Sequence, residues 1–108
     1  MINFDEIEEV VIKNFNNGEG EIIARIYNDG LNKILIGTLK KGCSVGYHKH
    51  ETSSEVIHIL NGKAKCIIDD KIEYLEKDDV HYCKKGSSHS VINENDEDLI
   101  MLCIVPNQ

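Results

Sequence analysis

Short runs of β-branched and aromatic residues follow one another along most of the chain, with turn-forming residues between them. Such runs are typical of β-strands. The turns are rich in Asn, Asp, Gly and Lys, and Asn61-Gly62 suits a two-residue hairpin turn because both residues tolerate positive φ. The acidic start, residues 3–9, is the only helix candidate, about one turn long. The predicted strands are residues 21–27, 33–39, 55–60, 63–69, 71–75, 80–83, 89–93 and 98–105.

Evenly spaced short strands predict an all-β fold of the sandwich, jelly-roll or small-barrel type. The chain has 108 residues, which is enough for one hydrophobic core and leaves little room for a second. It contains no repeat of solenoid period, no low-complexity tract and no linker. We therefore expect residues 1–108 to form a single domain.

The charge pattern limits the kinds of partner that the protein can have. The net charge is −7, and acidic and basic residues are interleaved along most of the chain. Nucleic acids and anionic membrane surfaces need a basic patch, so neither is an expected partner. The acidic N-terminus does not resemble a signal peptide, and no window approaches the ~20 apolar residues of a membrane span. We expect a cytoplasmic protein whose partner is a small molecule.

The four cysteines are widely spaced, and no two of them form a CxxC pair, so they do not predict a cysteine zinc site. In a cytoplasmic protein they are expected to be free thiols. Cys66 and Cys103 lie in apolar runs and are expected in the core. Cys43 and Cys83 lie near the histidine cluster described next, where packing is favoured over a pocket-lining role.

Three of the five histidines and a carboxylate crowd into residues 42–62. Side chains alternate along a strand, so His48 and His50 point to the same face if that segment is extended. Glu55 shares its face of the next strand with two isoleucines, and an inward carboxylate is costly unless it is paired or bound to a metal. The alternative is a surface loop with exposed histidines.

The spacing of these residues favours a metal site over a surface loop with exposed histidines. Gly42, His48, His50, Glu55 and Gly62 follow the pattern G-x5-H-x-H-x4-E-x6-G. With this pattern the sequence resembles the cupin family, whose first motif has the same form. The resemblance implies a jelly-roll barrel, the double-stranded β-helix, over residues 1–108, with motif one at residues 42–62.

The second cupin motif, G-x5-P-x-G-x2-H-x3-N, matches residues 78–93 in part. Gly86, His89 and Asn93 occupy their expected positions, whereas Asp78 and Lys84 replace the usual glycine and proline. Two turns must therefore be built differently, but no ligand position is affected.

The resemblance implies that His48, His50, Glu55 and His89 ligate one divalent metal. Three imidazoles and a carboxylate suit Mn, Fe, Co, Ni, Cu or Zn, so the identity of the metal stays open. Four protein ligands on a six-coordinate ion would leave two positions for water or substrate. By the same resemblance we expect a homodimer, joined through sheet faces or N-terminal strands.

An enzyme would need further polar groups, and the candidates are Arg25, Tyr47, His81 and Asn93. Arg25 could hold a substrate carboxylate, although pairing with a neighbouring acid on an exposed strand is favoured. Tyr47 could line the mouth of a pocket. His81 could be a general base, but a surface or edge position is favoured. The alternation of residues 55–60 places His58 outward or at a subunit interface.

Two functions remain in competition. One is a metal-dependent enzyme, a dioxygenase, lyase or isomerase acting on a small oxygenated acid or sugar derivative. The other is a non-catalytic cupin that binds or senses a small molecule. A barrel without metal is disfavoured because an unpaired buried Glu55 would destabilise it. A stand-alone transcriptional regulator is disfavoured because no basic helix-turn-helix segment is present.

Overall fold

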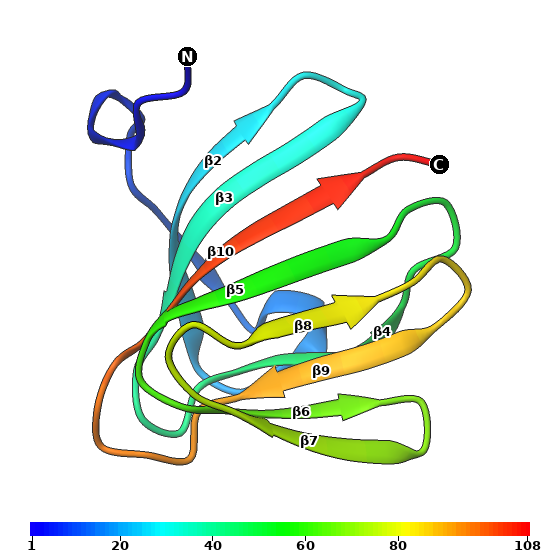
Figure 1. The fold of residues 1–108 in the computed structure, drawn as a ribbon. Helices are drawn as coiled ribbons and strands as arrows, with labels where there is room; N and C mark the ends of the chain where they lie inside the picture. The colour runs from blue at the N-terminus through cyan, green and yellow to red at the C-terminus, as the bar shows by residue number, and fades with distance from the viewer.

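The computed structural model describes residues 1–108 and consists almost entirely of antiparallel strands, which confirms the predicted all-β fold (Figure 1). Two short 3₁₀ turns, η1 (Phe4–Glu6) and η2 (Phe15–Asn17), lie near the N-terminus. The strands are β1 (Val10–Lys13), β2 (Glu21–Asn28), β3 (Asn32–Leu39), β4 (Ser44–Lys49), β5 (Glu55–Asn61), β6 (Ala64–Ile68), β7 (Lys71–Leu75), β8 (Val80–Cys83), β9 (Ser88–Ile92) and β10 (Leu99–Pro106).

The strands form two sheets that face each other. The six-stranded sheet has the order β1-β2-β3-β10-β5-β8, and the four-stranded sheet has the order β4-β9-β6-β7. Consecutive strands from β3 to β10 repeatedly change sheet, which is the jelly-roll pattern that the sequence predicts. Inward side chains of both sheets interdigitate to form one core, whose most deeply buried large residues are Leu39, Ile57, Ile59, Leu99 and Met101.

The predicted strands correspond to β2, β3 and β5 to β10, and each end agrees or differs by one residue. Two strands are absent from the prediction, β1 and β4. β4 carries Ser44, Gly46 and Lys49, which weaken its β-propensity, although its final residues do have the extended conformation assumed for the histidine pair. The helix expected over residues 3–9 is only the 3₁₀ turn η1.

The Asn61-Gly62 turn is not a hairpin turn, contrary to the prediction. β5 belongs to the six-stranded sheet and β6 to the four-stranded sheet, so the chain crosses between sheets here. Gly62 has a φ of 82°, and a Cβ atom at this position would overlap the backbone of Asp98. The Asn61 amide donates to the Asp98 carbonyl oxygen at 2.9 Å. The two-residue hairpin lies instead at Asp69-Asp70, between β6 and β7.

A close contact between backbones brings η2 against β4. A Cβ atom on Gly46 would overlap the Asn16 carbonyl, and one on Gly18 would overlap the Ser44 carbonyl. Only glycine allows this approach at both positions. As a result, Phe15 and Asn16 sit at the edge of the space between the two sheets.

No helix in the structure is both long enough and apolar enough to cross a membrane.

Candidate metal centre

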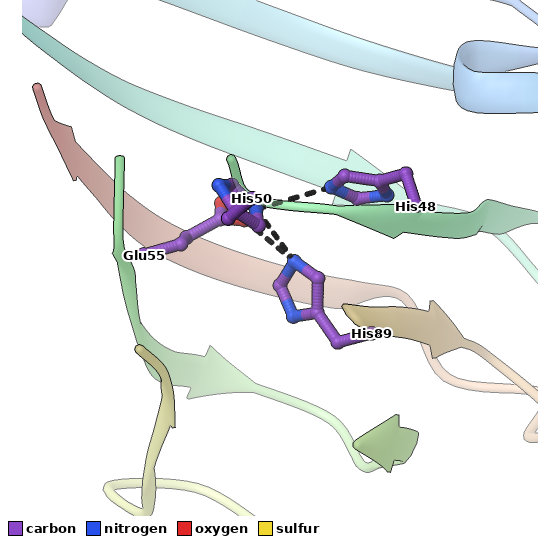
Figure 2. Close-up of side chains that lie close together, drawn as sticks. All are labelled: His48, His50, Glu55 and His89. Carbon is purple, nitrogen blue, oxygen red and sulfur yellow. Dashed lines mark hydrogen bonds and ion pairs between the residues drawn. The ribbon is translucent and has the colours of Figure 1, made fainter. Parts of the chain in front are cut away.

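The four predicted ligand side chains converge between the sheets (Figure 2). His48 lies on β4 and His50 one residue beyond its end, so both side chains point to the same side. The β4–β9 pairing places His48 opposite His89. Glu55 is the first residue of β5 and reaches across from the other sheet.

The loop of motif two holds His50 in position. The His50 N–H donates to the Ser87 carbonyl at 2.9 Å, and the Gly86 N–H donates to the His50 carbonyl at 2.7 Å. Gly86 adopts a φ of 93°, which requires the glycine found there. Asp78, which replaces the usual first glycine of the motif, adopts a φ of 73°, and Asp tolerates this conformation better than most residues do.

The potential ligand atoms lie at distances that fit a metal ion. His50 Nε2 lies 3.1 Å from His48 Nε2 and 3.0 Å from His89 Nε2. Glu55 Oε1 lies 3.0 Å from His89 Nε2 and 3.2 Å from His50 Nε2. Neighbouring ligands about 2.1 Å from an octahedral metal are about 3.0 Å apart. The four groups also combine borderline and hard donors, so together they could hold a divalent transition metal.

The charge states of these groups suit metal binding. Burial alone would raise the pKa of Glu55, but hydrogen bonds with His50 and His89 outweigh it and lower the pKa to about 2. Burial lowers the pKa of His48 below its usual value, against the opposing effect of its bond to the Gly46 carbonyl. A carboxylate and neutral imidazoles are the forms that ligate metals.

The outer nitrogens of His48 and His50 also have partners. His48 Nδ1 lies 2.7 Å from the Gly46 carbonyl oxygen. A carbonyl can only accept, so His48 carries its proton on Nδ1 and directs the Nε2 lone pair toward the cluster. His50 Nδ1 lies 2.8 Å from Ser53 Oγ, which orients the second ring.

His81 is buried, contrary to the expectation of a surface or edge position. His81 is 1% exposed, and its side chain contacts the outer nitrogen of His89. It does not line the cavity between the sheets that is described below. Burial lowers the pKa of His81, against the opposing bond to Glu73. The alternation of side chains along β8 places His81 on the opposite face from Val80 and Tyr82. The sequence alone does not show which of the two faces is the inner one, so it could not predict the burial of His81.

Arg25 and Tyr47 lie outside the cavity. The Arg25 guanidinium donates to the carbonyl oxygens of Phe4 at 3.3 Å and Ile7 at 2.5 Å, and thereby fixes the N-terminal segment. Tyr47 is 54% exposed, and its hydroxyl donates to the Asp69 carbonyl at 3.1 Å. Neither residue lines the cavity beside the four-residue cluster.

Asn93 has contacts typical of a structural residue. It is fully buried, and its amide donates to the carbonyl oxygens of Leu39 at 2.8 Å and Glu97 at 3.0 Å. Its side-chain oxygen accepts from the Asn95 N–H at 2.9 Å. These bonds tie the loop between β9 and β10 to the end of β3.

His58 points outward, as predicted, and its Nε2 lies 3.3 Å from Asp78 Oδ1. All four cysteines are free thiols. Cys43 and Cys83 do not line the cavity, in agreement with the favoured packing role, whereas Cys103 belongs to the core and also lines the cavity. Burial raises the pKa of the Cys83 thiol to about 11, so it is not a reactive thiolate.

A cavity extends from the four-residue cluster between the sheets, and 12 of its 18 lining residues are hydrophobic. Besides the cluster, its polar lining residues are Lys33 and Asn16. The sequence patterns did not identify Lys33 as a site residue, although its side chain lies on the same face of β3 as those of the inward residues Leu35 and Leu39. Its ammonium group lies 5.8 Å from the centre of the Phe15 ring.

A second, more polar hollow adjoins this inner cavity. The two spaces share residues from η2, β3, β10 and the histidine pair, so these residues lie where the two spaces meet. Glu55 and His89 line only the inner cavity. The shared residues are Phe15, Asn16, Lys33, His48, His50 and Val105.

An antiparallel jelly roll with three histidines and one glutamate converging on its inner face defines a small cupin. Comparison with known families agrees, because the Cupin domain model matches residues 35–105. The chain belongs to the cupin family.

Two of the strongest matches come from Thermotoga maritima. The chain is 31% identical to a protein called an oxalate-binding protein, over 97% of this chain and 92% of the relative. The crystal structure of a predicted oxalate decarboxylase superimposes with a TM-score of 0.92 and 27% identity, covering 100% of this chain and 99% of the other. An RmlC-like cupin from Shewanella frigidimarina, 13% identical with a TM-score of 0.82, shares the fold over 100% of this chain and 90% of its own.

Proposed function

We propose that the protein holds one divalent transition metal at His48, His50, Glu55 and His89 and binds a small dicarboxylate there, with oxalate as the first candidate. The observation that carries this proposal is a cavity whose only polar groups besides that cluster are Lys33 and Asn16. Similarity to an oxalate-binding protein over nearly the whole of both chains supports the same ligand class.

The charges in the cavity favour a dianion. Glu55 contributes one negative charge and Lys33 one positive charge, so a divalent metal leaves two positive charges unbalanced. A dicarboxylate neutralises them, and the apolar walls strengthen the attraction because water is excluded. A metal held by the four-residue cluster would supply a Lewis acid for one carboxylate, and Lys33 could donate a charge-assisted hydrogen bond to the ligand.

The apolar walls disfavour the sugar derivatives that the sequence left open. A sugar presents many hydroxyl groups, and each would need a hydrogen-bond partner on entering the cavity. The cavity offers only Lys33 and Asn16 besides the metal cluster. A ligand with two charged ends and no further polar groups fits this lining better.

Binding is also favoured over turnover. An enzyme of the lyase or isomerase type needs a group that moves protons at the substrate. Arg25 and Tyr47 lie outside the cavity, and His81 lies behind His89. Cys103 also lines the cavity, but burial raises the pKa of its thiol well above the usual value, so Lys33 is the remaining side chain that could serve. We therefore place binding first and treat product formation as an outcome to be tested.

The experiment is calorimetric titration of oxalate into the manganese-loaded protein, with Lys33→Met beside the wild type. Loss of one charge-assisted hydrogen bond is expected to weaken oxalate binding by about 10- to 100-fold. Lys49→Met is the matched control, because Lys49 lies between the two histidines but points away from them. Manganese affinity should be unchanged in both variants.

Three results would overturn parts of this proposal. Failure of the wild type to bind manganese would remove the metal site. Equal oxalate affinity in the wild type and Lys33→Met would remove the role of Lys33. Conversion of oxalate to formate and carbon dioxide, measured by formate release from the manganese-loaded protein, would make the protein an enzyme instead of a binding protein.

We further propose that the protein acts as a homodimer in the cytoplasm. The outer face of the six-stranded sheet supports dimerisation, because an antiparallel sheet with one solvated face normally carries polar residues there. Here one row of paired outward residues is apolar across five strands, and it consists of Tyr27, Ile34, Ile104, Val56 and Tyr82. Four free thiols fit a reducing compartment.

Light scattering at micromolar concentration tests the dimer. Ile104→Glu, at the centre of this row, should give the monomer mass and leave metal affinity intact, because a charge is costly in a buried interface. Ile72→Glu is the control, since Ile72 is 54% exposed on β7 of the other sheet. A monomeric wild type, or a dimeric Ile104→Glu variant, would contradict this interface.

A further inference from the structure

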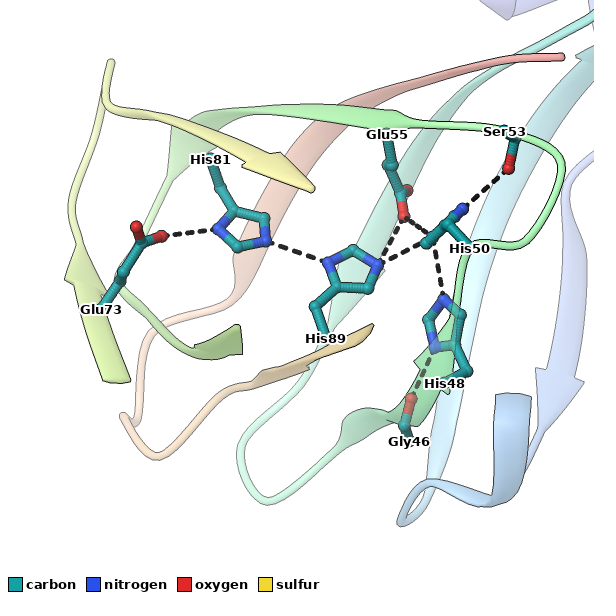
Figure 3. A network of polar contacts seen from close by, with 8 residues as sticks. All are labelled: Gly46, His48, His50, Ser53, Glu55, Glu73, His81 and His89. Atoms are coloured by element: carbon teal, nitrogen blue, oxygen red, sulfur yellow. Dashed lines mark hydrogen bonds and ion pairs between the residues drawn. The ribbon is translucent and has the colours of Figure 1, made fainter. Parts of the chain in front are cut away.

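A series of polar contacts continues outward from the four-residue cluster, from His89 through the buried His81 to Glu73 (Figure 3). His89 Nδ1 lies 2.9 Å from His81 Nε2, and His81 Nδ1 lies 2.7 Å from Glu73 Oε1. The residues come from β9, β8 and β7 and so join the two sheets. His81 and His89 are 1% and 0% exposed, so water does not compete for the contact between the two rings.

The two rings are aligned for hydrogen bonding. Their planes differ by only 6° and their centroids are 5.2 Å apart. With 2.9 Å between the facing nitrogens, the rings meet end to end and nearly in one plane instead of face to face. A lone pair on an imidazole nitrogen lies in the ring plane, so this arrangement points donor and acceptor directly at each other.

The directions of these hydrogen bonds follow from Glu73, the last residue in the series of contacts. An ionised carboxylate can only accept a hydrogen bond, and the half-exposed Glu73 side chain is the acceptor at this end. His81 therefore donates from Nδ1 to Glu73, which leaves the His81 Nε2 lone pair as an acceptor when the ring is neutral. His89 can then donate from Nδ1 and keep Nε2 without a proton, as a metal ligand requires.

We propose that Glu73 and His81 are positioning residues that hold His89 in the tautomer and ring orientation needed to bind the metal. This inference rests on the proposed metal site and assigns a role to two residues outside it. The Glu73 carboxylate can only accept, so it fixes which nitrogen of His81 carries the proton. His81 in turn fixes which nitrogen of His89 carries its proton. Outer partners of this kind commonly change metal affinity by about 10- to 100-fold when they are removed.

The test compares the zinc affinity of the purified, metal-stripped protein in His81→Leu and His81→Gln, measured by competition with a chromophoric chelator. Leucine fills much of the space but cannot accept a hydrogen bond, whereas the glutamine side-chain oxygen can accept from His89 Nδ1. We expect affinity to fall about 10- to 100-fold in His81→Leu and to recover substantially in His81→Gln.

A second variant and a matched control guard against simple misfolding. Glu73→Leu removes the acceptor at a half-exposed position, where water can replace it in part, so we expect a smaller loss than in His81→Leu. His58→Leu removes the histidine of an exposed histidine–carboxylate pair, 3.3 Å from Asp78, and should leave zinc affinity unchanged. Urea unfolding of each metal-free variant verifies that it is folded.

A spectroscopic readout separates positioning from packing. In ¹⁵N-labelled zinc-loaded protein, two-bond proton–nitrogen correlation should show His81 neutral with its proton on Nδ1. Wild-type zinc binding combined with equal affinity in His81→Leu, or with an Nε2-protonated His81, would overturn the positioning role alone. A wild type that binds no zinc would instead overturn the proposed metal site.

Discussion

Replacement of Glu55 by glutamine should destabilise the metal-free protein in a way that depends on pH. The side chain of Glu55 is only 13% exposed, and its carboxylate contacts His50 and His89. Glutamine has nearly the same shape but cannot ionise. The variant therefore removes the favourable interactions of the negative charge without opening a cavity.

The magnitude follows from the pKa of Glu55. Its pKa falls from 4.5 to about 2 in the folded protein, because the hydrogen bonds with His50 and His89 outweigh burial. At about 1.36 kcal/mol for each pKa unit, the ionised form contributes about 3 kcal/mol at neutral pH. A lowered pKa gives stability that is complete above the unfolded pKa and is lost as pH falls from 4.5 toward 2.

The assay is urea unfolding of metal-stripped wild type and Glu55→Gln between neutral pH and about pH 3. The difference in unfolding free energy should be about 3 kcal/mol at neutral pH and about 1 kcal/mol near pH 3. Glu94→Gln is the control, because Glu94 is exposed and lies 4.0 Å from Lys65, so its ion pair contributes little. A wild-type advantage that stays constant across this range would refute the reasoning.

Three other substitutions separate the metal site from the scaffold. His50→Ala should lose the metal, as measured by elemental analysis, because His50 contacts three other members of the cluster, and full occupancy would contradict the four-ligand site. Asn93→Ala should lower the free energy of unfolding by about 2–4 kcal/mol in urea, since two carbonyls lose their donor, while zinc affinity stays unchanged. Gly46→Ala should push η2 away from β4 and weaken oxalate binding in calorimetry, because its Cβ would overlap the Asn16 carbonyl; unchanged binding would show that η2 does not shape the cavity.

The sequence predicted the parts of the site that depend on strand periodicity and motif spacing. Alternation alone placed His48 and His50 on one face and separated His58 from Glu55, and the structure shows the same division. Motif spacing added His89, which periodicity could not have connected to residues so distant in sequence. The same alternation could have identified Lys33 as inward-facing, because its strand neighbours at alternate positions are buried leucines.

Contacts between the sheets could not be predicted in this way. Glu73 meets His81 across the sandwich, and neither strand pattern indicates that these strands face each other. β8 has alternating residues but only four of them, so either face could have been the inner one. The prediction of a hairpin at Asn61-Gly62 was wrong for a related reason. A positive φ is compatible both with a hairpin and with a crossing between sheets.

The division of the cluster between the sheets links metal binding to the stability of the fold. Glu55 belongs to the six-stranded sheet, whereas His48 and His89 belong to the four-stranded sheet. A metal held by all of them would join the two sheets at the cavity. Because such a metal binds the folded chain and not the unfolded chain, it would stabilise the protein by about 2.7 kcal/mol at a hundredfold excess over its dissociation constant. A metal would also replace the Glu55–histidine contacts, so the pH dependence expected of the metal-free protein should shrink once the site is loaded.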